Sequence, residues 1–523
     1  MRLFKSLFFK SAMVFLFFFF LFFFTHLLNG QFISSDDPYY HAKHALLIEQ
    51  SGEINLVEPW LEFHFLNFAP ADYWWGFHLG MAIFIHWFGL FLGVEIFASI
   101  LATLVFLIFY LILNELRVKY PLAWLSFLFF SSTAFIYRLL LERPHLLAIM
   151  VLPLAFLLLV KKKNFWLFIL SLFYALSYVL APLIVLQTLI YLAVDFYTNK
   201  RVNLRPLIAS TAGILAGVII HPNSLNYLYG MFTQNWLVLF LRLTGVNLGI
   251  GSEVQLASFF TFLNLNFLTL IFYILAATLF LSLKRVDRES TVNIFLFLCS
   301  SFWLLVTLLV PRGVEYWLPI TFIFAAVMFS DFSAGEGFEQ AKDWLVDRIN
   351  FKIIGFFLIS LLALVVFYNL GNVFYNLYYD KTGEISANYE QANIWLKANT
   401  VEGSLVFYNN FSMWPMMFFY NNYNHYIIGM DPTSTYEYNK QTYWLWRNIS
   451  FQGLSCDKPS PCFDISPRDQ VKLVPLTIKT VFRSKYAVVS NYENSNLIKT
   501  LNNLKAQVRL VFKNKDLLIY EMR

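Results

Sequence analysis

The sequence predicts a polytopic α-helical membrane protein with about 11 transmembrane helices, followed by a C-terminal extracytoplasmic domain of mixed α/β structure. Of its 523 residues, 59% are hydrophobic and only 13% are charged, whereas soluble proteins carry about 25% charged residues. Apolar runs long enough to cross a bilayer recur between residues 1 and 371, and none occurs in 372–523. We therefore predict a transmembrane domain at 1–371 and an extracytoplasmic domain at 372–523.

The first apolar run, Ala12 to Leu28, follows a basic start. It is long for the apolar part of a signal peptide and no small-x-small cleavage site follows it, so we predict a retained first helix. The predicted spans lie at 11–28, 94–116, 121–137, 145–160, 164–180, 181–198, 206–221, 258–283, 291–310, 316–331 and 352–371. One further apolar stretch, Trp74 to Gly93, is predicted to lie along the outer membrane surface, because that choice places the basic loops on one side.

Basic residues set the predicted orientation, since cytoplasmic loops are enriched in Lys and Arg. The predicted spans place the N-terminus and the run Lys161–Lys163 in the cytoplasm and the C-terminal domain outside. This describes a multi-pass cell-membrane protein with two long outer loops, 29–93 and 222–257. All nine histidines fall at or beyond the outer boundary.

Three acids lie close to the membrane in three different outer loops, namely Asp37, Glu142 and Glu253. Ionisable groups near a bilayer are costly and mark functional sites, and carboxylates from separate loops can together hold Mg²⁺ or Mn²⁺. Plainer roles stay open. Asp37 before Pro38 can instead cap a helix. Glu142 can form an ordinary ion pair with Arg143, and Glu253 can be a solvated loop acid.

The region 372–523 alternates helix and strand patterns. "ANYEQANIWLKANT" and "NSNLIKTLNNLKA" are predicted helices, and "SLVFY", "NHYIIG", "KYAVVS", "VRLVFK" and "LLIYEM" are predicted strands. An extracytoplasmic location would favour a small disulfide loop between Cys456 and Cys462. Cys299 lies inside an apolar run and is predicted to be packing.

Two short motifs of the outer loops are "DPYYHAKH", Asp37 to His44, and "SEVQLASFF", Ser252 to Phe260. They resemble motifs of the GT-C class of membrane glycosyltransferases, and within it those of the catalytic subunit of oligosaccharyltransferase. The first is similar to that family's first acidic motif after the first helix, and the second resembles its Ser-Glu-x-Gln motif. Glu142 to His145 lies where the family has a second acidic pair, and Arg312 lies where an arginine grips the donor's pyrophosphate. The polar α/β tail also matches in place.

The sequence departs from that family in two places. The WWD signature, which reads the Ser or Thr of the acceptor sequon, is missing: "FYNNFSMWPMMFFY", Phe407 to Tyr420, contains Trp414 and no Asp. The second acidic motif is altered to an ExxH arrangement. The acceptor and the metal dependence therefore stay open.

The resemblance implies an inverting glycosyltransferase that moves a sugar or oligosaccharide from a polyprenyl-(pyro)phosphate donor to an extracytoplasmic protein, glycan or lipid acceptor. Asp37, Glu142 and His145 would hold a divalent metal, Mn²⁺ or Mg²⁺. Arg312 would bind the donor phosphate, and Glu253 would act with Asp37 in catalysis. Further acceptor or sugar contacts are predicted at Asp36, Tyr39, His41, Trp74, Trp75 and Trp414.

Two alternatives are retained. In the first, a GT-C enzyme transfers a single sugar from a polyprenyl phosphate to a hydroxyl of a lipid, glycan or protein, with Asp37 as general base and no metal. In the second, the chain transports a lipid-linked glycan, which would require charged residues near the midplane of its spans. The charge pattern does not indicate nucleic-acid binding.

Overall fold

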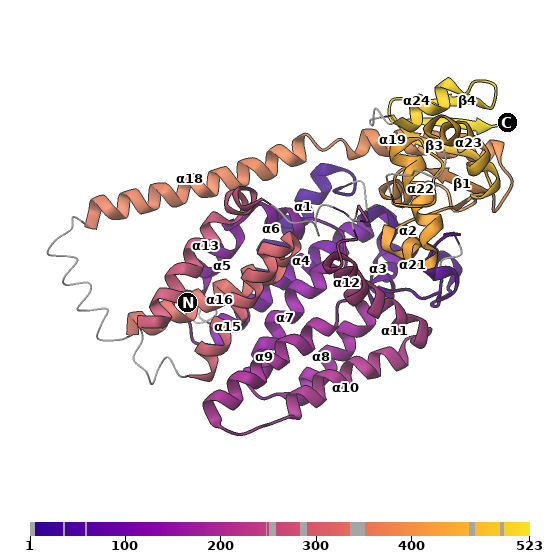
Figure 1. Cartoon of the computed structure of the whole chain (residues 1–523). Helices are drawn as coiled ribbons and strands as arrows, with labels where there is room; N and C mark the ends of the chain where they lie inside the picture. Colours follow the sequence, from indigo (N-terminus) through magenta and orange to yellow (C-terminus); the bar gives the residue numbers. More distant parts are fainter. Residues whose placement is uncertain are drawn as a thin grey trace. The chain divides into compact units, whose positions relative to one another are not determined.

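The computed structural model describes residues 6–34, 37–57, 60–246, 248–249, 251, 258–282, 290–334, 351–459, 466–491 and 496–523. Contacts divide the chain into two compact units (Figure 1). The helical unit comprises Met1–Gly30, Glu95–Ile220 and Ser252–Tyr379. The mixed unit comprises Gln31–Val94, His221–Gly251 and Asp380–Arg523. Most of both long loops identified in the sequence therefore belongs with the C-terminal residues.

The helical unit is built from helices that cover every predicted apolar segment. They are α1 (Leu7–Asn29), α4 (Leu90–Glu115), α5 (Pro121–Phe130), α6 (Thr133–Leu139), α7 (His145–Val160), α8 (Asn164–Ser177), α9 (Pro182–Asn199), α10 (Arg205–Ile220), α13 (Phe259–Ser282), α15 (Thr291–Leu309), η5 (Pro311–Gly313), α16 (Val314–Ala334) and α18 (Phe351–Tyr378). Within the described residues, five are long and apolar enough to cross a membrane, namely α1, α4, α13, α15 and η5–α16; the bent pair α5–α6 would make a sixth. The chain is thus a helical membrane protein, and the larger number of spans stays a prediction.

The core of the helical unit is formed by α7 and α16. Every residue of α16 from Val314 to Met328 is buried, and the helix packs against α5, α7, α13 and α15. A helix that is apolar on all sides is stable only when it is surrounded by other helices or by lipid.

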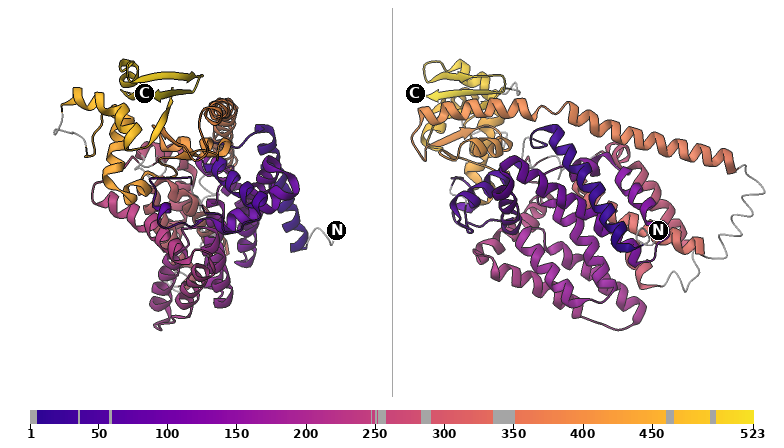
Figure 2. Two further views of the ribbon diagram at one scale, coloured as in Figure 1. Left: turned by 90° about the vertical axis from the view of Figure 1, so that its right-hand side faces the viewer. Right: turned by 180° about the vertical axis from the view of Figure 1, so that it is seen from behind.

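Helices α8 and α10 approach each other closely through two glycines. Helix α9 runs beside them, as the views in Figures 1 and 2 show. A Cβ atom added at Gly213 would lie 2.4 Å from the carbonyl oxygen of Phe168, and one at Gly217 would lie 2.7 Å from Ala175 Cβ. The glycines lie in "GILAG", a G-x-x-x-G spacing that places both on one helix face. This sequence therefore determines how tightly the two helices pack.

The mixed unit contains a five-stranded sheet with the order β2-β1-β3-β5-β4. Its strands are β1 (Leu405–Tyr408), β2 (His425–Tyr426), β3 (Ser484–Ser490), β4 (Val508–Lys513) and β5 (Leu517–Met522). β1 pairs in parallel with β2 and β3, whereas β5 is antiparallel to β3 and β4. All five strands fall on predicted stretches, so the predicted C-terminal sheet is confirmed.

The helices of the mixed unit come from three separate parts of the chain. They are α2 (Asp37–Ser51), η2 (Phe65–Asn67), α3 (Trp75–Phe88), α11 (Ser224–Phe232), η3 (Thr233–Leu237), α12 (Val238–Leu243), α19 (Thr382–Asn399), η6 (Phe411–Met413), α20 (Trp414–Tyr420), α21 (Pro432–Tyr438), α22 (Lys440–Gln452), α23 (Pro467–Thr480) and α24 (Asn496–Asn503). The two predicted helices of the tail correspond to α19 and α24. The first long loop also joins the sheet, because Leu61 forms a parallel bridge with Tyr426 of β2.

Helix α3 occupies most of the stretch predicted to lie on the membrane surface. Its Ile83, Trp87 and Phe88 side chains are exposed, as expected for a helix with one face towards lipid. The two histidines of α3 have different environments, since the His78 side chain is fully buried whereas that of His86 is 66% exposed. The orientation of α3 relative to a bilayer stays a prediction.

The cysteines differ in state. Cys299 is free and buried within α15, as predicted. Cys456 is disulfide-bonded, and Cys462 lies outside the described residues.

Candidate functional site

The predicted site residues are divided between the two units. Glu142, His145 and Arg312 belong to the helical unit, and the mixed unit holds Asp37, Tyr39, His41, Trp74, Trp75 and Trp414. Asp36 and Glu253 lie outside the described residues. The grouping of Asp37 with Glu142 and His145 around one metal ion stays a prediction.

Glu142 lies in the connection between α6 and α7, His145 is the first residue of α7, and both side chains are fully buried. They face different partners. Glu142 Oε1 lies 3.1 Å from His26 Nδ1 of α1, and His145 donates from Nε2 to the carbonyl oxygen of Arg138 at 2.8 Å. Glu95 of α4 is also buried, and its charge interacts with those of His26 and Glu142. The helical unit therefore brings a second acid to Glu142.

Arg312 belongs to a group of two arginines and one acid, Arg138, Arg312 and Glu315, here called the arginine–glutamate cluster. The fully buried Glu315 carboxylate accepts a hydrogen bond from Arg138 Nε, and Arg312 Nε lies 3.5 Å from the same oxygen. Arg312 also donates from Nη2 to the hydroxyl of Tyr178 at 2.8 Å. One carboxylate between two guanidinium groups leaves net positive charge. Because the Arg312 side chain is 28% exposed, an anion can reach it.

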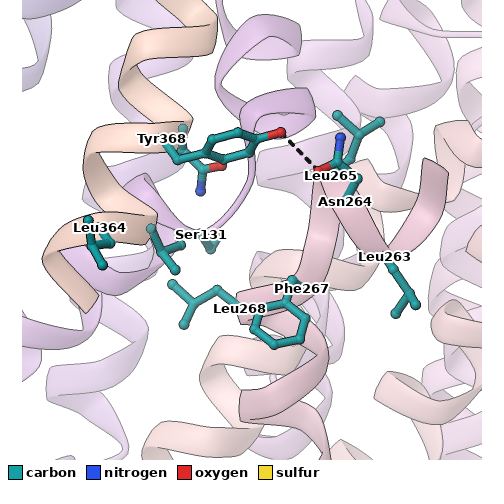
Figure 3. Close-up of a pocket in the computed structure, with 10 residues that line it drawn as sticks. Ser131, Leu263, Asn264, Leu265, Phe267, Leu268, Leu364 and Tyr368 are labelled. Atoms are coloured by element: carbon teal, nitrogen blue, oxygen red, sulfur yellow. Dashed lines mark hydrogen bonds between the residues drawn. The ribbon is translucent and has the colours of Figure 1, made fainter. Parts of the chain in front are cut away.

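A cavity of about 410 Å³ lies in the helical unit where helices are irregular. α5 and α6 meet at a bend of 94°, and α13 leaves helical geometry at Asn266. Ser132 donates to Asn266 Oδ1 at 2.9 Å, and Asn369 of α18 donates to the carbonyl oxygen of the last residue of α5 at 2.8 Å. At the cavity itself, Tyr368 donates to Asn264 at 2.9 Å (Figure 3). These bonds satisfy the polar groups that helix breaks expose within a membrane.

Asp37 is the first residue of α2 and is half-buried. The helix predicted after it is confirmed. A second acid of the mixed unit, Asp431, accepts a hydrogen bond from the Thr433 amide at 2.6 Å at the start of α21. Burial raises the pKa of Asp431, the bonds to Thr433 oppose that rise, and the negative charge of Asp37 adds to it. The mixed unit thus holds a second acid that interacts with Asp37.

The predicted aromatic contacts are mostly covered by protein. Tyr39 and Trp414 are buried, and the Trp414 ring packs on Tyr40 with centroids 5.0 Å apart. Trp75 is half-buried and donates from Nε1 to the carbonyl oxygen of Ile54 at 2.6 Å. Their role as sugar or acceptor contacts stays a prediction.

Three buried side chains from three segments meet in the mixed unit: His44 of α2, Asp72 before α3, and His78 of α3. We call them the histidine–aspartate cluster. His78 Nδ1 donates to Asp72 Oδ2 at 2.7 Å, and His44 Nε2 lies 3.4 Å from the same oxygen. The two imidazole rings are stacked, with centroids 4.4 Å apart.

The electrostatics of this cluster favour an ionised Asp72 beside a neutral His78 ring. Burial alone would raise the pKa of Asp72, but the adjacent His78 and His44 rings and the hydrogen bonds from His78 and Trp74 hold it at about 2. Burial lowers the pKa of His78, although Asp72 opposes that shift. At neutral pH, Asp72 is therefore a carboxylate and His78 a neutral imidazole.

Several of these residues were missed by sequence reasoning. Glu315 stands three residues after Arg312 inside an apolar run, which is a signal for a buried ion pair on one helix face. Asp72 stands beside Trp74 and Trp75 in "ADYWWGF". The sequence-based prediction for this stretch concerned sugar or acceptor contacts of the two tryptophans and did not include Asp72. For the pairing of Arg138 with Glu315, no local signal exists in the sequence.

The fold of the chain is similar to that of a solved oligosaccharyltransferase, and this likeness supports a GT-C-like fold. Among solved structures the chain is similar to the archaeal oligosaccharyltransferase AglB from Archaeoglobus fulgidus, in complex with an inhibitory peptide and a dolichol-phosphate. The TM-score is 0.60 at 12% identity, over 93% of this chain and 70% of that chain. No protein family and no curated protein sequence matches the chain.

Proposed function

We propose that the protein is a membrane-embedded inverting glycosyltransferase that moves a sugar or oligosaccharide from a polyprenyl-(pyro)phosphate donor to an extracytoplasmic acceptor. The observation that carries this proposal is the likeness to an oligosaccharyltransferase along 93% of the chain. That enzyme is described with a peptide and a dolichol-phosphate, which are the two kinds of molecule that such a reaction joins. The sequence motif at Asp37 supports the same function.

Arg312 is proposed to bind the donor phosphate. Its guanidinium group is pre-positioned by Glu315 and Tyr178, and the second guanidinium of Arg138 adds positive charge. In the reaction, the acceptor attacks the anomeric carbon, the bond from that carbon to the phosphate oxygen breaks, and the (pyro)phosphate leaves on its polyprenol. Fixed positive charge stabilises the negative charge that develops on the departing phosphate.

Asp37 is proposed to act on the acceptor. For an amide acceptor, its carboxylate would accept a hydrogen bond from the attacking group. For a hydroxyl acceptor, it would take the proton as general base. Glu253 is proposed to assist Asp37, and the extracytoplasmic location of this chemistry follows from the predicted topology.

The residues of the helical unit fit a divalent metal ion. Glu142 supplies a buried carboxylate, and the Nδ1 atom of His145 is buried with no hydrogen-bond partner among the described residues. A site of carboxylate oxygens with one imidazole suits Mn²⁺ better than Mg²⁺, which prefers oxygen ligands alone. When bound with Asp37 as a further ligand, the ion would compensate charge on the leaving phosphate.

The cavity beside Tyr368 also agrees with a lipid-linked donor. Its lining is mainly Leu, Val and Phe, with Asn264, Asn369 and Ser131 as its other polar members (Figure 3). We propose that it accommodates part of the polyprenyl chain, because an apolar cavity in the membrane-spanning part excludes charged ligands.

A hydroxyl acceptor is the second candidate. The segment Phe407 to Tyr420 contains no acid, and its single tryptophan, Trp414, is buried. This observation favours an acceptor other than an Asn-x-Ser/Thr sequon, so the assay should offer both peptide and hydroxyl acceptors.

The test uses the purified protein with a radiolabelled polyprenyl-linked sugar donor. Asp37→Asn removes the negative charge with little change in size, and we expect transfer to fall by about 10²–10⁴-fold. The matched control is Glu49→Gln on the same helix, where Glu49 pairs with the exposed His86, and it should keep normal transfer. Transfer by Asp37→Asn at the normal rate would mean that Asp37 only begins the helix.

A further inference from the structure

The histidine–aspartate cluster has the geometry of a metal site. One donor atom from each of His44, Asp72 and His78 can be chosen so that all three lie within 4.8 Å of one another. The side chains of both histidines are fully buried and that of Asp72 is 3% exposed. The donors come from α2, from the segment before α3 and from α3, so one ion would link separate segments of the first long loop.

Surrounding groups hold two of the three donors, Asp72 and His78, in place. The Trp74 amide donates to Asp72 Oδ1 at 2.9 Å, which leaves Oδ2 facing the two histidines. His221 donates from Nε2 to the Asp72 carbonyl oxygen at 2.9 Å. The Nε2 atom of His78 shares a hydrogen bond of 2.8 Å with His41 Nδ1. Metal-bound histidines characteristically use their second nitrogen in this way, which fixes the ring and its tautomer.

Imidazole, amide and aromatic groups surround the Asp72 carboxylate. The groups that act on the Asp72 carboxylate are His78, His44 and the Trp74 amide, and none of these described groups carries a permanent positive charge. Aromatic rings close the surroundings, with Tyr40 at 5.8 Å from His44 and 5.7 Å from His78 between ring centroids. A metal ion bound between these groups would compensate the charge of this buried carboxylate.

We propose that His44, Asp72 and His78 bind one divalent transition-metal ion of the zinc class, which joins α2 to α3. Two imidazole nitrogens and one carboxylate oxygen are ligands that zinc accepts readily, whereas magnesium and calcium prefer oxygen alone. A water molecule would complete a tetrahedral site. This ion is separate from the metal proposed at Glu142 and His145, because it is held entirely by the mixed unit.

Metal entry requires one local change. The His78 Nδ1 to Asp72 Oδ2 distance of 2.7 Å is that of a hydrogen bond, whereas two ligands of a tetrahedral zinc ion lie about 3.3 Å apart. The proton on His78 must then sit on Nε2, from which it is donated to His41 Nδ1. His44 and Asp72, at 3.4 Å, already have the separation of ligand atoms.

The expected role of the ion is to fix the start of α2. Helix α2 carries His44 and begins at Asp37, the residue proposed to act on the acceptor. An ion that joins α2 to α3 would hold that helix in position without contacting the acceptor.

The experiment measures metal content of the full-length protein in detergent micelles. The protein is stripped with a chelator, loaded with Zn²⁺ and passed through a desalting column before elemental analysis. We expect about one zinc ion per chain in a background of Asp37→Asn with Glu142→Gln, which removes two ligands of the other proposed site. Adding His44→Gln or Asp72→Asn to this background should abolish zinc retention.

The matched control is His86→Gln, which changes an exposed histidine of the same α3 helix and should retain the ion. X-ray absorption of the zinc-loaded background protein should show imidazole ligands. Failure of that protein to retain zinc, or unchanged zinc content in a folded His44→Gln variant, would overturn the proposal. Where a variant does not fold, the background protein decides, because absence of imidazole ligands in its absorption spectrum would also overturn it. Glycosyl transfer is measured separately, so either proposal can fail without the other.

Discussion

Two of the buried polar clusters among the described residues, one in each unit, differ in the kind of charge they contain. The arginine–glutamate cluster of the helical unit holds two guanidinium groups, which stay charged at all relevant pH values, and one carboxylate. The histidine–aspartate cluster of the mixed unit holds one carboxylate and two imidazoles, which can be neutral. The first therefore has net positive charge and suits an anion, whereas the second has net negative charge when its rings are neutral and suits a cation. Both are buried, so burial alone does not tell which ligand a polar group can take.

Removing the acid of the helical unit is expected to have the largest effect. Glu315→Leu leaves Arg138 and Arg312 without the carboxylate that both contact, and a buried charge without its partner costs about 3–5 kcal/mol of stability. Thermal unfolding of the purified protein in micelles measures this loss. The control Arg138→Met with Glu315→Leu removes one of the two guanidinium groups as well and should be more stable than the single variant. A Glu315→Leu protein as stable as the parent would show that the cluster is hydrated in the membrane protein.

Replacing Arg312 tests whether the positive cluster serves an anion. Arg312→Gln should lower glycosyl transfer by about 10²–10³-fold, the loss typical for removal of one group that stabilises developing negative charge. Arg312→Lys keeps the charge and loses the planar guanidinium group, so its activity should lie between that of Arg312→Gln and that of the parent protein. Arg201 is exposed, and Arg201→Gln should transfer at the parental rate. Equal activity of Arg312→Gln and the parent would show that Arg312 does not bind the donor phosphate.

Acidification should destabilise the mixed unit through the buried imidazole of His64. Burial lowers the pKa of His64 from 6.5 to about 3, and its Nδ1 accepts a hydrogen bond from the Leu66 amide at 3.0 Å. Between these two pKa values the unfolded chain binds a proton that the folded chain does not. Stability therefore falls as the pH drops below about 6.5, by up to about 1.4 kcal/mol per pH unit.

The variant His64→Asn keeps a side-chain acceptor for the Leu66 amide and has no titrating ring. Denaturant unfolding is measured at pH 7 and at pH 5, with the protease sensitivity of mixed-unit peptides as the readout. Between these pH values, the free energy of unfolding of the variant should fall by about 2 kcal/mol less than that of the parent. An unchanged pH dependence would mean that the His64 ring is protonated in the folded state. Peptides of α10 (Arg205–Ile220) serve as the internal control, since this helix contains no histidine and no acid.

The features predicted from sequence are those determined by local patterns. The apolar segments became helices, and stretches such as "KYAVVS" became strands, because hydropathy and side-chain periodicity are properties of neighbouring residues. Asp37 could likewise be placed at the start of a helix. The pairing of Arg138 with Glu315 could not be predicted, because 177 positions separate them and only the packing of helices brings them together.

The contacts of the predicted site residues likewise depend on packing and not on neighbouring residues in the sequence. "ADYWWGF" was interpreted by its aromatic rings, whereas its acid, Asp72, meets His44 only through the packing of α2 against α3. Tyr39 and Trp414 were predicted to contact the acceptor or a sugar because of their place in stretches compared with the family's motifs. Their burial depends on aromatic neighbours such as Phe419, whose ring centroid lies 5.0 Å from that of Tyr39. Residue type predicts what a side chain can do, and packing determines what it can reach.

The smallest effect is expected at the exposed histidine of α3. His86 Nδ1 lies 3.0 Å from Glu49 Oε1, but its side chain is 66% exposed, and solvent-exposed ion pairs contribute about 0–1 kcal/mol. We expect His86→Gln to change the unfolding temperature little, in contrast to His78→Gln two turns earlier on the same helix, which would disrupt bonds to both Asp72 and His41. Unfolding curves of the two variants measured side by side give the comparison. Similar destabilisation by both variants would mean that helix α3 is sensitive to any substitution. The polar contacts of His78 would then make no measurable contribution of their own to stability.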